Sequence, residues 1–479
     1  MRPAVVARYV GLALLLNAIF LCLSAGVSFI YRDAAFTPLL LSAVTAFIVG
    51  IFPFIFVPPE IEINTREGYL IVVLGWCVSC LFGMLPYILY GDVFSVSNAW
   101  FESVSGYTTT GASALQEVET LPYGLLFWRS ATQWIGGVGV VVFTLLVLPS
   151  VGSAKIRLSR TQASVKHEDA NYSTQKIVRV ILNVYVGLTV TLAVLLWVSG
   201  MSLFDAVNHA FSTVATGGFS TRNASIMYYN SPLIEAILIV FMVISGINFG
   251  LLYVSIMKKF TPLLNSPVVR YFVCALAVGI LLTTVSLISS GGYTSWLQAF
   301  REAAFQLTSI ATTTGFAASS NALWPSFAIV LSFFFMLQCG CAGSTSGGIK
   351  ADRVLIFYKA FVANIRRMLH PNAIVSVRLR GISMDEGVVS AASLFIVLYM
   401  LIAFIVTLLL LLSGLDLLTS FSAAVTALSN VGPGYGEIYS LGNYSGFSIF
   451  AKIVCTVAMI VGRLEIYGVL MLFYYRYWR

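Results

Sequence analysis

The sequence predicts an all-α polytopic membrane protein with four pseudo-symmetric repeats around one axis, preceded by two extra transmembrane helices. Three observations support this prediction: the composition, the lengths of the apolar runs, and a glycine-containing motif found four times. Hydrophobic residues make up 59% of the 479-residue chain and charged residues 10%, with a mean hydropathy of +0.92. Because soluble domains carry about 25% charged residues, this composition indicates an integral membrane protein.

The apolar runs predict the transmembrane helices, since about 20 residues are needed to cross the hydrocarbon core. We expect ten spans, near 8–31, 36–57, 69–90, 125–149, 177–199, 232–256, 268–289, 325–369, 387–412 and 447–473. The eighth run contains an interruption rich in glycine and serine. Runs of this length are typical of helices and not of the short alternating strands of a membrane β-barrel.

Lysine and arginine set the orientation, because cytoplasmic segments carry an excess of them. With the N-terminus in the cytoplasm, the inner segments hold Lys155, Arg157, Arg160, Lys166, Lys176, Arg179, Lys258, Lys259, Arg270, Arg353, Lys359, Arg366, Arg367, Arg378, Arg380, Arg476 and Arg479. The outer loops carry Asp92, Glu117, Glu119, Asp205, Asp416 and Glu437. The net charge of +8 is therefore an inner-face excess. It calls for no nucleic-acid partner and suits an acidic protein or membrane lipid.

A polar motif follows a short amphipathic segment at four places in the chain. The copies read WFESVSGYTTTGAS, DAVNHAFSTVATGGFS, REAAFQLTSIATTTGFAAS and FSAAVTALSNVGPGYG. Aligned on one glycine, they place the steps Thr110-Gly111, Thr216-Gly217, Thr314-Gly315 and Val431-Gly432 in register. These glycines recur at intervals of roughly 100 residues, as expected for fourfold internal duplication.

Each segment before its glycine is too short to span the membrane. Irregular backbone at membrane depth is tolerated where it is buried in protein or lines a watery cavity, so four such re-entrant loops predict one pore. A dehydrated monovalent cation needs replacement oxygens, which backbone carbonyls supply in potassium filters. The predicted cation-binding residues are Thr109, Thr110, Gly111, Ala215, Thr216, Gly217, Thr313, Thr314, Gly315, Asn430, Val431 and Gly432. A lone glycine of this kind would be read as a helix C-cap, but four matched copies favour a filter.

Together with STSGGIK at 344–350 and GRLE at 462–465, these loops resemble the Trk/Ktr/HKT superfamily of potassium transport proteins. The two spans ahead of the first loop are similar to its TrkH branch. The resemblance implies potassium-channel-like M1–P–M2 repeats, one pore per subunit and a homodimer in the bacterial inner membrane. It also implies cytosolic TrkA-like subunits whose RCK domains bind a nucleotide (ATP/ADP or NAD). This chain has no Rossmann fingerprint, so we expect no cofactor on it and only K⁺ as the transported ion.

The same reasoning divides the chain into five parts. They are the N-terminal helix pair (1–66), pore repeat 1 (67–152), a cytoplasmic linker with pore repeat 2 (153–262), pore repeat 3 with a broken M2 helix (263–380) and pore repeat 4 (381–479).

The interruption in the eighth run predicts a gate. LQCGCAGSTSGGIK (337–350) separates two helical halves, neither of which spans comfortably alone. We expect an unwound, movable segment below the filter, and the resemblance places an intramembrane loop at the same position. The predicted gate residues are Gly340, Gly343, Ser344, Thr345, Gly347, Gly348, Lys350 and Arg463. Arg463 lies in the last span, where a charge normally faces a cavity or a partner; Lys350 is either a second such charge or a lysine at the cytoplasmic boundary.

Two other functions compete with a channel-like filter. A proton- or sodium-coupled symporter would use the same path, with Glu235, Glu302 and His209 as the available relay groups. An enzyme would need a nucleophile with its base, paired acids or metal ligands, and the three histidines, His167, His209 and His370, lie in separate segments. The residues after the glycines differ among the four loops, so we expect modest selectivity between K⁺ or Rb⁺ and Na⁺.

Overall fold

The computed structural model describes residues 2–58, 64–91, 93–146, 174–257, 261–373, 375–379, 382–466 and 468–469. The start of the predicted cytoplasmic linker, residues 153–173, lies outside these ranges, and so do Lys258, Lys259, Arg380, Arg476 and Arg479. The predicted all-α polytopic fold with four repeats is confirmed. Six helices are long and apolar enough to cross a membrane within the described residues, and a seventh span exists if one bent helix pair is counted as one.

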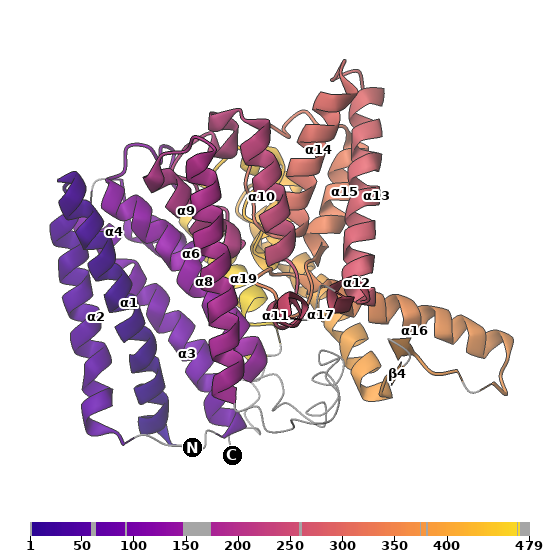
Figure 1. Ribbon diagram of the computed structural model, residues 1–479, viewed down its shortest axis with the longest axis horizontal. Coiled ribbons are helices and arrows are strands. Elements are labelled where there is room, and N and C mark those ends of the chain that lie inside the picture. The colour runs from indigo at the N-terminus through magenta and orange to yellow at the C-terminus, as the bar shows by residue number, and fades with distance from the viewer. Residues whose placement is uncertain are drawn as a thin grey trace.

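Two N-terminal helices, α1 (Pro3–Tyr31) and α2 (Phe36–Phe56), form a pair at one side of the molecule (Figure 1). Their backbones approach closely at Gly11 and Gly50, where a Cβ atom on either glycine would collide with the other's carbonyl oxygen. Close approach through small residues is the usual way for helices to pack in lipid. Large apolar side chains such as Phe29 and Ile55 remain exposed on the outside, as expected for a surface that faces acyl chains.

Each repeat contains an outer helix, a short pore helix, a loop and an inner helix. Repeat 1 comprises α3 (Thr65–Gly83), α4 (Leu85–Tyr90), α5 (Val96–Tyr107) and α6 (Tyr123–Leu146), and repeat 2 comprises α8 (Thr174–Val198), α9 (Leu203–Val214), η3 (Ser225–Tyr229), α10 (Pro232–Ser245) and α11 (Phe249–Met257). After α12 (Thr261–Leu264), repeat 3 comprises α13 (Pro267–Ser289), α14 (Trp296–Ala311), α15 (Ser326–Leu337), β1 (Gln338–Cys339), β2 (Ile349–Lys350) and α16 (Ala351–Leu369). Repeat 4 comprises β3 (Arg378–Leu379), β4 (Ile382–Ser383), α17 (Glu386–Leu411), α18 (Leu417–Ser429), η4 (Gly436–Ile438) and α19 (Ile449–Arg463).

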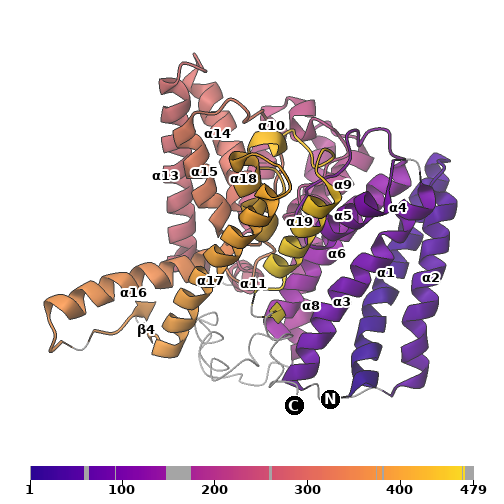
Figure 2. The same ribbon diagram turned by 180° about the vertical axis from the view of Figure 1, so that it is seen from behind.

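The pore helices α5, α9, α14 and α18 are short because local signals start and stop them. Ser95, Ser202 and Asp416 cap the N-termini of α5, α9 and α18 by accepting bonds from backbone N–H groups of the first turn. In Figure 2, α5, α18 and α19 lie side by side near the centre of the molecule. The pore helices are therefore held inside the protein, where their polar side chains avoid lipid.

One predicted span is wrong as a continuous helix. The run 232–256 breaks into α10 and α11, which are bent by 104°. The backbone groups released at the break bond to residues about a hundred positions further along the chain: Gly246 O accepts from Cys341 N at 2.8 Å, and Phe249 N donates to Gly343 O at 3.1 Å. Asn248 adds a bond from its side-chain amide to Ala342 O at 2.8 Å. The interrupted segment of repeat 3 thus supplies the hydrogen-bond partners for the backbone at the bend.

The interruption predicted in the eighth span is confirmed, since α15 ends at Leu337 and α16 begins at Ala351. A parallel pairing of β1 with β2 joins the two ends of the intervening segment, with Gln338 opposite Ile349 and Cys339 opposite Lys350. Residues 340–348 therefore form a closed loop on a short stem, called here the intramembrane loop. The two helices do not form one transmembrane span in a single direction. Helix α16 runs sideways out of the bundle, across the direction of α15 (Figures 1 and 2).

Candidate functional site

All four pore helices end in the same backbone motif. A residue in the left-handed region follows each helix, and a glycine with positive φ follows two residues later. The left-handed residues are Thr109, Thr216, Thr313 and Asn430 (φ 52–58°), and the glycines are Gly111, Gly218, Gly315 and Gly432 (φ 79–92°). The residue between them donates its N–H five residues back, from Thr110 to Ser105, Gly217 to Ser212, Thr314 to Ser309 and Val431 to Thr426. This pattern is a Schellman helix ending.

Three of the four left-handed positions are occupied by threonine, which the local conformational preference of the backbone disfavours there. A β-branched residue with positive φ is a genuine outlier, and such strain costs of order 1–3 kcal/mol per residue. Strained backbone persists only where the surroundings determine it, and it collects at functional sites. The motif is therefore typical of a loop whose conformation is imposed by its surroundings, and not of an ordinary helix end.

The second loop is out of register with the sequence alignment. Backbone conformation and hydrogen bonding make Gly218, not Gly217, the counterpart of Gly111, Gly315 and Gly432. Exposure agrees in three of the loops, where Gly111, Gly218 and Gly315 are partly exposed between buried neighbours while Gly217 is buried; in the fourth loop Gly432 is buried. The alignment on Gly217 is wrong by one residue, because two consecutive glycines fit the motif equally well.

The four loops close into a ring. A Cβ atom added to Gly111 would collide with the carbonyl oxygen of Gly217 in the second loop. Likewise, a Cβ atom on Gly218 would collide with Thr314 O, one on Gly315 with Val431 O, and one on Gly432 with Thr110 O. Each glycine thus packs against the carbonyl of the next loop, and the fourth loop returns to the first. Four segments separated by about a hundred residues meet around one axis.

Hydroxyl groups of the loops are turned back toward the pore helices. Thr108 and Thr110 share a hydrogen bond of 2.8 Å between their hydroxyls, and Thr312 and Thr314 share one of 2.9 Å. Ala215 has no counterpart hydroxyl, and it is buried like the predicted threonines of the loops. These four hydroxyls are thus engaged within their own repeats, and the close contacts between neighbouring loops are made by backbone carbonyls.

Two residues that the sequence reasoning missed hold loop carbonyls directly. The Gln133 amide donates to Gly217 O at 2.7 Å and accepts from Phe219 N at 3.1 Å. The Tyr444 hydroxyl donates to Gly432 O at 2.8 Å. Gln133 gives one usable signal in sequence, because an amide inside an apolar helix requires a buried partner.

The intramembrane loop lies against the ends of three pore helices. Gly347 N donates to the Thr313 hydroxyl at 3.0 Å, and a Cβ atom at Gly347 would collide with Ser429 O. The Thr345 hydroxyl bonds to Val214 O at 3.1 Å and to Ser245 O at 3.3 Å. The predicted gate segment and the predicted filter loops are therefore in contact.

The remaining gate residues of this segment shape the loop itself. The Ser344 hydroxyl bonds to Cys341 O at 2.6 Å, and Gly340 O accepts from Ala351 N at 3.0 Å. Gly343 and Gly348 have positive φ, where glycine is favoured. Lys350 is buried, and its ammonium group donates to Ser346 O. The Lys350 side chain is thus engaged within the loop, and its role in gating stays a prediction.

Arg463 is buried and joins the loop to the first repeat. Its guanidinium donates to Thr345 O at 2.8 Å and to Gly136 O at 3.2 Å. It lies at the C-terminal end of α19, which ends at this residue, and not inside a longer helix. Glu465 pairs with Arg353 of α16, with 2.5 Å between Nη2 and Oε2.

These features define a polytopic membrane protein with four pore loops around one axis and a loop beneath them, which is a membrane transport architecture. The chain belongs to the TrkH family of cation transport proteins, whose family model matches residues 40–478. It is 35% identical over 481 residues, 99% of both chains, to the Trk system potassium uptake protein TrkH of Escherichia coli K12. It is 37% identical to that of Halomonas elongata over 87% of both chains.

The fold is similar to the crystal structure of the potassium transporter TrkH from Vibrio parahaemolyticus, with a TM-score of 0.92. The two chains share 34% sequence identity, and the match covers 100% of each. The family and the architecture are thus established together by sequence and by structure.

Proposed function

We propose that this chain takes up potassium, and with it rubidium, across the bacterial inner membrane through the ring of four loops. The observation that carries the proposal is the closed ring, in which each of four glycines packs against the neighbouring loop's carbonyl. Pore-helix C-termini, which carry partial negative charge, end at this ring and favour a cation there. The printed names of the relatives, which are potassium uptake proteins, support the choice of ion.

We assign cation binding to the backbone of the loops, with Gly218 added to the residues predicted from sequence. The carbonyl of Gly217 is already engaged by the Gln133 amide at 2.7 Å, so it is a weaker ligand for an ion. A ring with unequal oxygens supports modest discrimination against Na⁺, because selectivity depends on the number and field of the coordinating carbonyls.

Regulation enters from the cytoplasmic side in this proposal. The intramembrane loop blocks the path below the ring, held there by Arg463 and stabilised by Lys350. Helix α16 follows the loop directly and is paired to Glu465, so a pull on α16 would move the loop. We assign this pull to cytosolic TrkA-like subunits that bind the nucleotide, with the N-terminus of this chain on the same side.

A homodimer is part of the proposal. Helix α16 extends from the bundle and presents exposed apolar side chains, among them Phe361 (58%) and Met368 (82%) (Figure 1). A second copy of the chain is the occupant that the TrkH resemblance implies for such a face, with membrane lipid around it.

A coupled symporter is not favoured by any observed contact. Among the relay candidates, Glu235 is held by Arg301 through two bonds of 2.7 Å, Glu302 accepts from the Tyr293 hydroxyl at 2.6 Å, and His209 bonds to Ser220 at 2.9 Å. Reversal potentials across imposed H⁺ and Na⁺ gradients test coupling directly. A potential that follows either gradient would replace the channel-like mechanism.

The filter is tested by reconstitution into liposomes, with K⁺, Rb⁺ and Na⁺ flux measured for the parent chain and for Gly111→Ser and Gly432→Ser. Both substitutions place a side chain against a neighbouring carbonyl at positive φ. We expect lower K⁺ flux and weaker discrimination against Na⁺ in both. Unchanged flux and selectivity in both variants would refute the filter assignment.

A further inference from the structure

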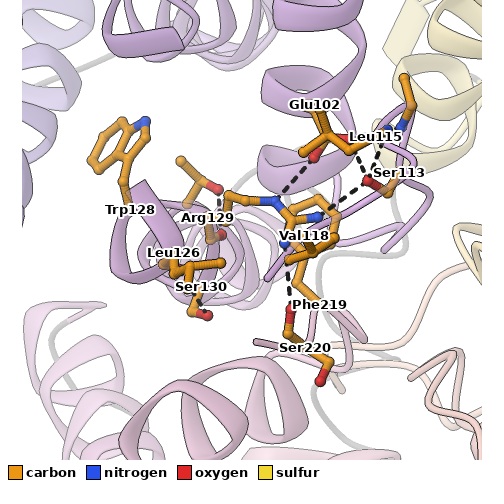
Figure 3. A network of polar contacts seen from close by, with 12 residues as sticks. Glu102, Ser113, Leu115, Val118, Leu126, Trp128, Arg129, Ser130, Phe219 and Ser220 are labelled. Carbon is orange, nitrogen blue, oxygen red and sulfur yellow. Dashed lines mark hydrogen bonds and ion pairs between the residues drawn. The ribbon is translucent and has the colours of Figure 1, made fainter. Parts of the chain in front are cut away.

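A buried ion pair lies behind the first two filter loops (Figure 3). Arg129 of α6 and Glu102 of α5 are 2% and 0% exposed, with 3.1 Å between Nε and Oε2. Neither residue belongs to the predicted ring, and the transport path described above does not use them. A buried pair is weak evidence for stability, since desolvation offsets much of the attraction. Its retention in a membrane protein therefore calls for another explanation.

Glu102 is a strut between the first pore helix and its loop. Its Oε1 atom accepts from the Ser113 hydroxyl at 2.6 Å and from Ala114 N at 2.7 Å. These residues directly follow Gly111 and Ala112. The carboxylate thus fixes the outer part of the first loop against the helix that carries it.

The second repeat has a matching strut. His209 occupies the position in α9 that Glu102 occupies in α5, seven residues before the left-handed residue in each case. Its Nε2 bonds to the hydroxyl of Ser220 at 2.9 Å, and Ser220 follows Gly218 by two residues as Ser113 follows Gly111. The contact between pore helix and loop is therefore repeated by pseudo-symmetry.

The third and fourth repeats lack the strut in the part of the chain that the structure describes. The matching helix positions hold Gln306 and Ala423, and the matching loop positions hold Ala317 and Gly434. Gln306 is buried, and its side-chain oxygen has no hydrogen-bond partner among the described residues. Other residues connect pore helix and loop there: the Ser309 hydroxyl donates to Phe316 O and Tyr435 N donates to the Ser422 hydroxyl, each at 2.7 Å. A strut at this position is therefore found in repeats 1 and 2.

Arg129 joins the two struts. Its Nη2 donates to the Ser113 hydroxyl at 3.3 Å, and its Nη1 donates to Ser220 O at 3.4 Å. Its guanidinium also stacks 4.0 Å from the centre of the Phe219 ring, the residue after Gly218. Figure 3 shows the side chain reaching from the glutamate on one side to the Phe219–Ser220 segment on the other. A planar group with five donors is suited to such bridging.

We propose that Arg129, compensated by Glu102, is a positioning residue that fixes the first and second filter loops relative to each other and thereby sets ion selectivity. The pair supplies a rigid contact between loops that no backbone bond provides at this point. The second half of the ring depends on other contacts, such as that of Tyr444. This inference rests on the proposed filter, because it assigns the pair a role in shaping that ring.

The test compares Rb⁺ and Na⁺ flux in liposomes for Arg129→Lys, Glu102→Gln, Ser113→Ala and the double variant Glu102→Gln/Arg129→Gln. Lysine keeps the charge but cannot bridge both loops, and Ser113→Ala keeps both charges. The matched control is Gln306→Leu, at the equivalent position of the third repeat. Loading is normalised to the folded, monodisperse fraction of each variant.

We expect the Rb⁺/Na⁺ flux ratio to fall by about tenfold in Arg129→Lys and in the double variant, the scale of a lost charged hydrogen bond. Gln306→Leu should keep the parent ratio. A parent-like Rb⁺/Na⁺ ratio in both Arg129→Lys and Ser113→Ala would overturn the proposal. A parent-like ratio in the double variant would also overturn it, because it would indicate that the pair has a purely electrostatic role. If Arg129→Lys and Glu102→Gln fail to fold, the double variant and Ser113→Ala decide the question. If Gly111→Ser alters selectivity and the Arg129 and Ser113 variants do not, this inference alone is rejected. If Gly111→Ser and Gly432→Ser both leave flux and selectivity unchanged, the filter itself is rejected.

Discussion

The backbone N–H of Gly347 donates a hydrogen bond of 3.0 Å to the hydroxyl of Thr313. One end of this bond belongs to the intramembrane loop and the other to a filter loop. Thr313 is also in the left-handed region, with φ of 58°. This contact therefore links the conformation of the proposed filter to the position of the proposed gate, and one substitution can remove it.

Thr313→Val removes the acceptor of this bond and keeps the shape of the side chain. We expect a several-fold increase in cation flux without a cytosolic partner, because a hydrogen bond contributes about 1 kcal/mol to the closed position. Flux into liposomes measures the effect. The matched comparison is Thr109→Val, since the Thr109 hydroxyl has no partner among the described residues. Equal changes in the two variants would mean that the contact with Gly347 does not control the gate.

Gly347→Ala is expected to displace the intramembrane loop. The added Cβ atom would meet the carbonyl of Ser429 and the side chain of Asn430, and neither the helix end nor the loop has room to absorb it. We predict higher basal flux with little change in thermal unfolding. Gly187→Ala in α8 is the control, because nothing lies within 4 Å of its added Cβ atom. Parent-like flux in Gly347→Ala would contradict the tight contact.

The register of the second loop can be tested by comparing Gly218→Ala with Gly217→Ala. Gly218 has φ of 79°, and its Cβ atom would collide with backbone, whereas the atoms nearest a Cβ at Gly217 belong to the Gln133 side chain. We expect Gly218→Ala to lose more K⁺ flux. A larger loss of K⁺ flux in Gly217→Ala than in Gly218→Ala would support the alignment on Gly217.

Arg463→Gln is predicted to raise cation flux by about tenfold or more, because hydrogen bonds from a charged donor contribute about 1.5–3 kcal/mol. The variant weakens the bonds to Thr345 O and Gly136 O and removes a positive charge that opposes cations. The measurement is K⁺ flux at two salt concentrations. A reduction of flux would indicate that Arg463 maintains an open path and not a closed one.

The fold was accessible from sequence because its signals are local. Apolar length and glycine-terminated amphipathic segments identify the repeats, and a run of small residues identifies the break after α15. The bend between α10 and α11 was not accessible, since its backbone groups are satisfied by Cys341 and Gly343, about a hundred residues away. No local pattern reports a partner at that separation.

The site was predicted less completely than the fold. Threonine at the left-handed positions runs against local preference, so only the assembled ring explains it. The choice between Gly217 and Gly218 depends on backbone conformation, which two adjacent glycines do not reveal. The roles of Arg129 and Glu102 depend on a contact between separate helices, and each residue alone resembles any polar group in a membrane segment.

The closed ring of loops is encoded in one continuous chain, and this has a consequence for how its selectivity changes during evolution. In a pore built from identical subunits, a single codon change alters every quarter of the ring at once. Here a change at Gly218 or Thr314 alters one quarter and leaves three as they were. Ion preference can therefore be adjusted in small steps, and the four sectors are free to diverge, as the residues after the glycines already show: Ala112, Phe219, Phe316 and Pro433, of which only the two phenylalanines are alike.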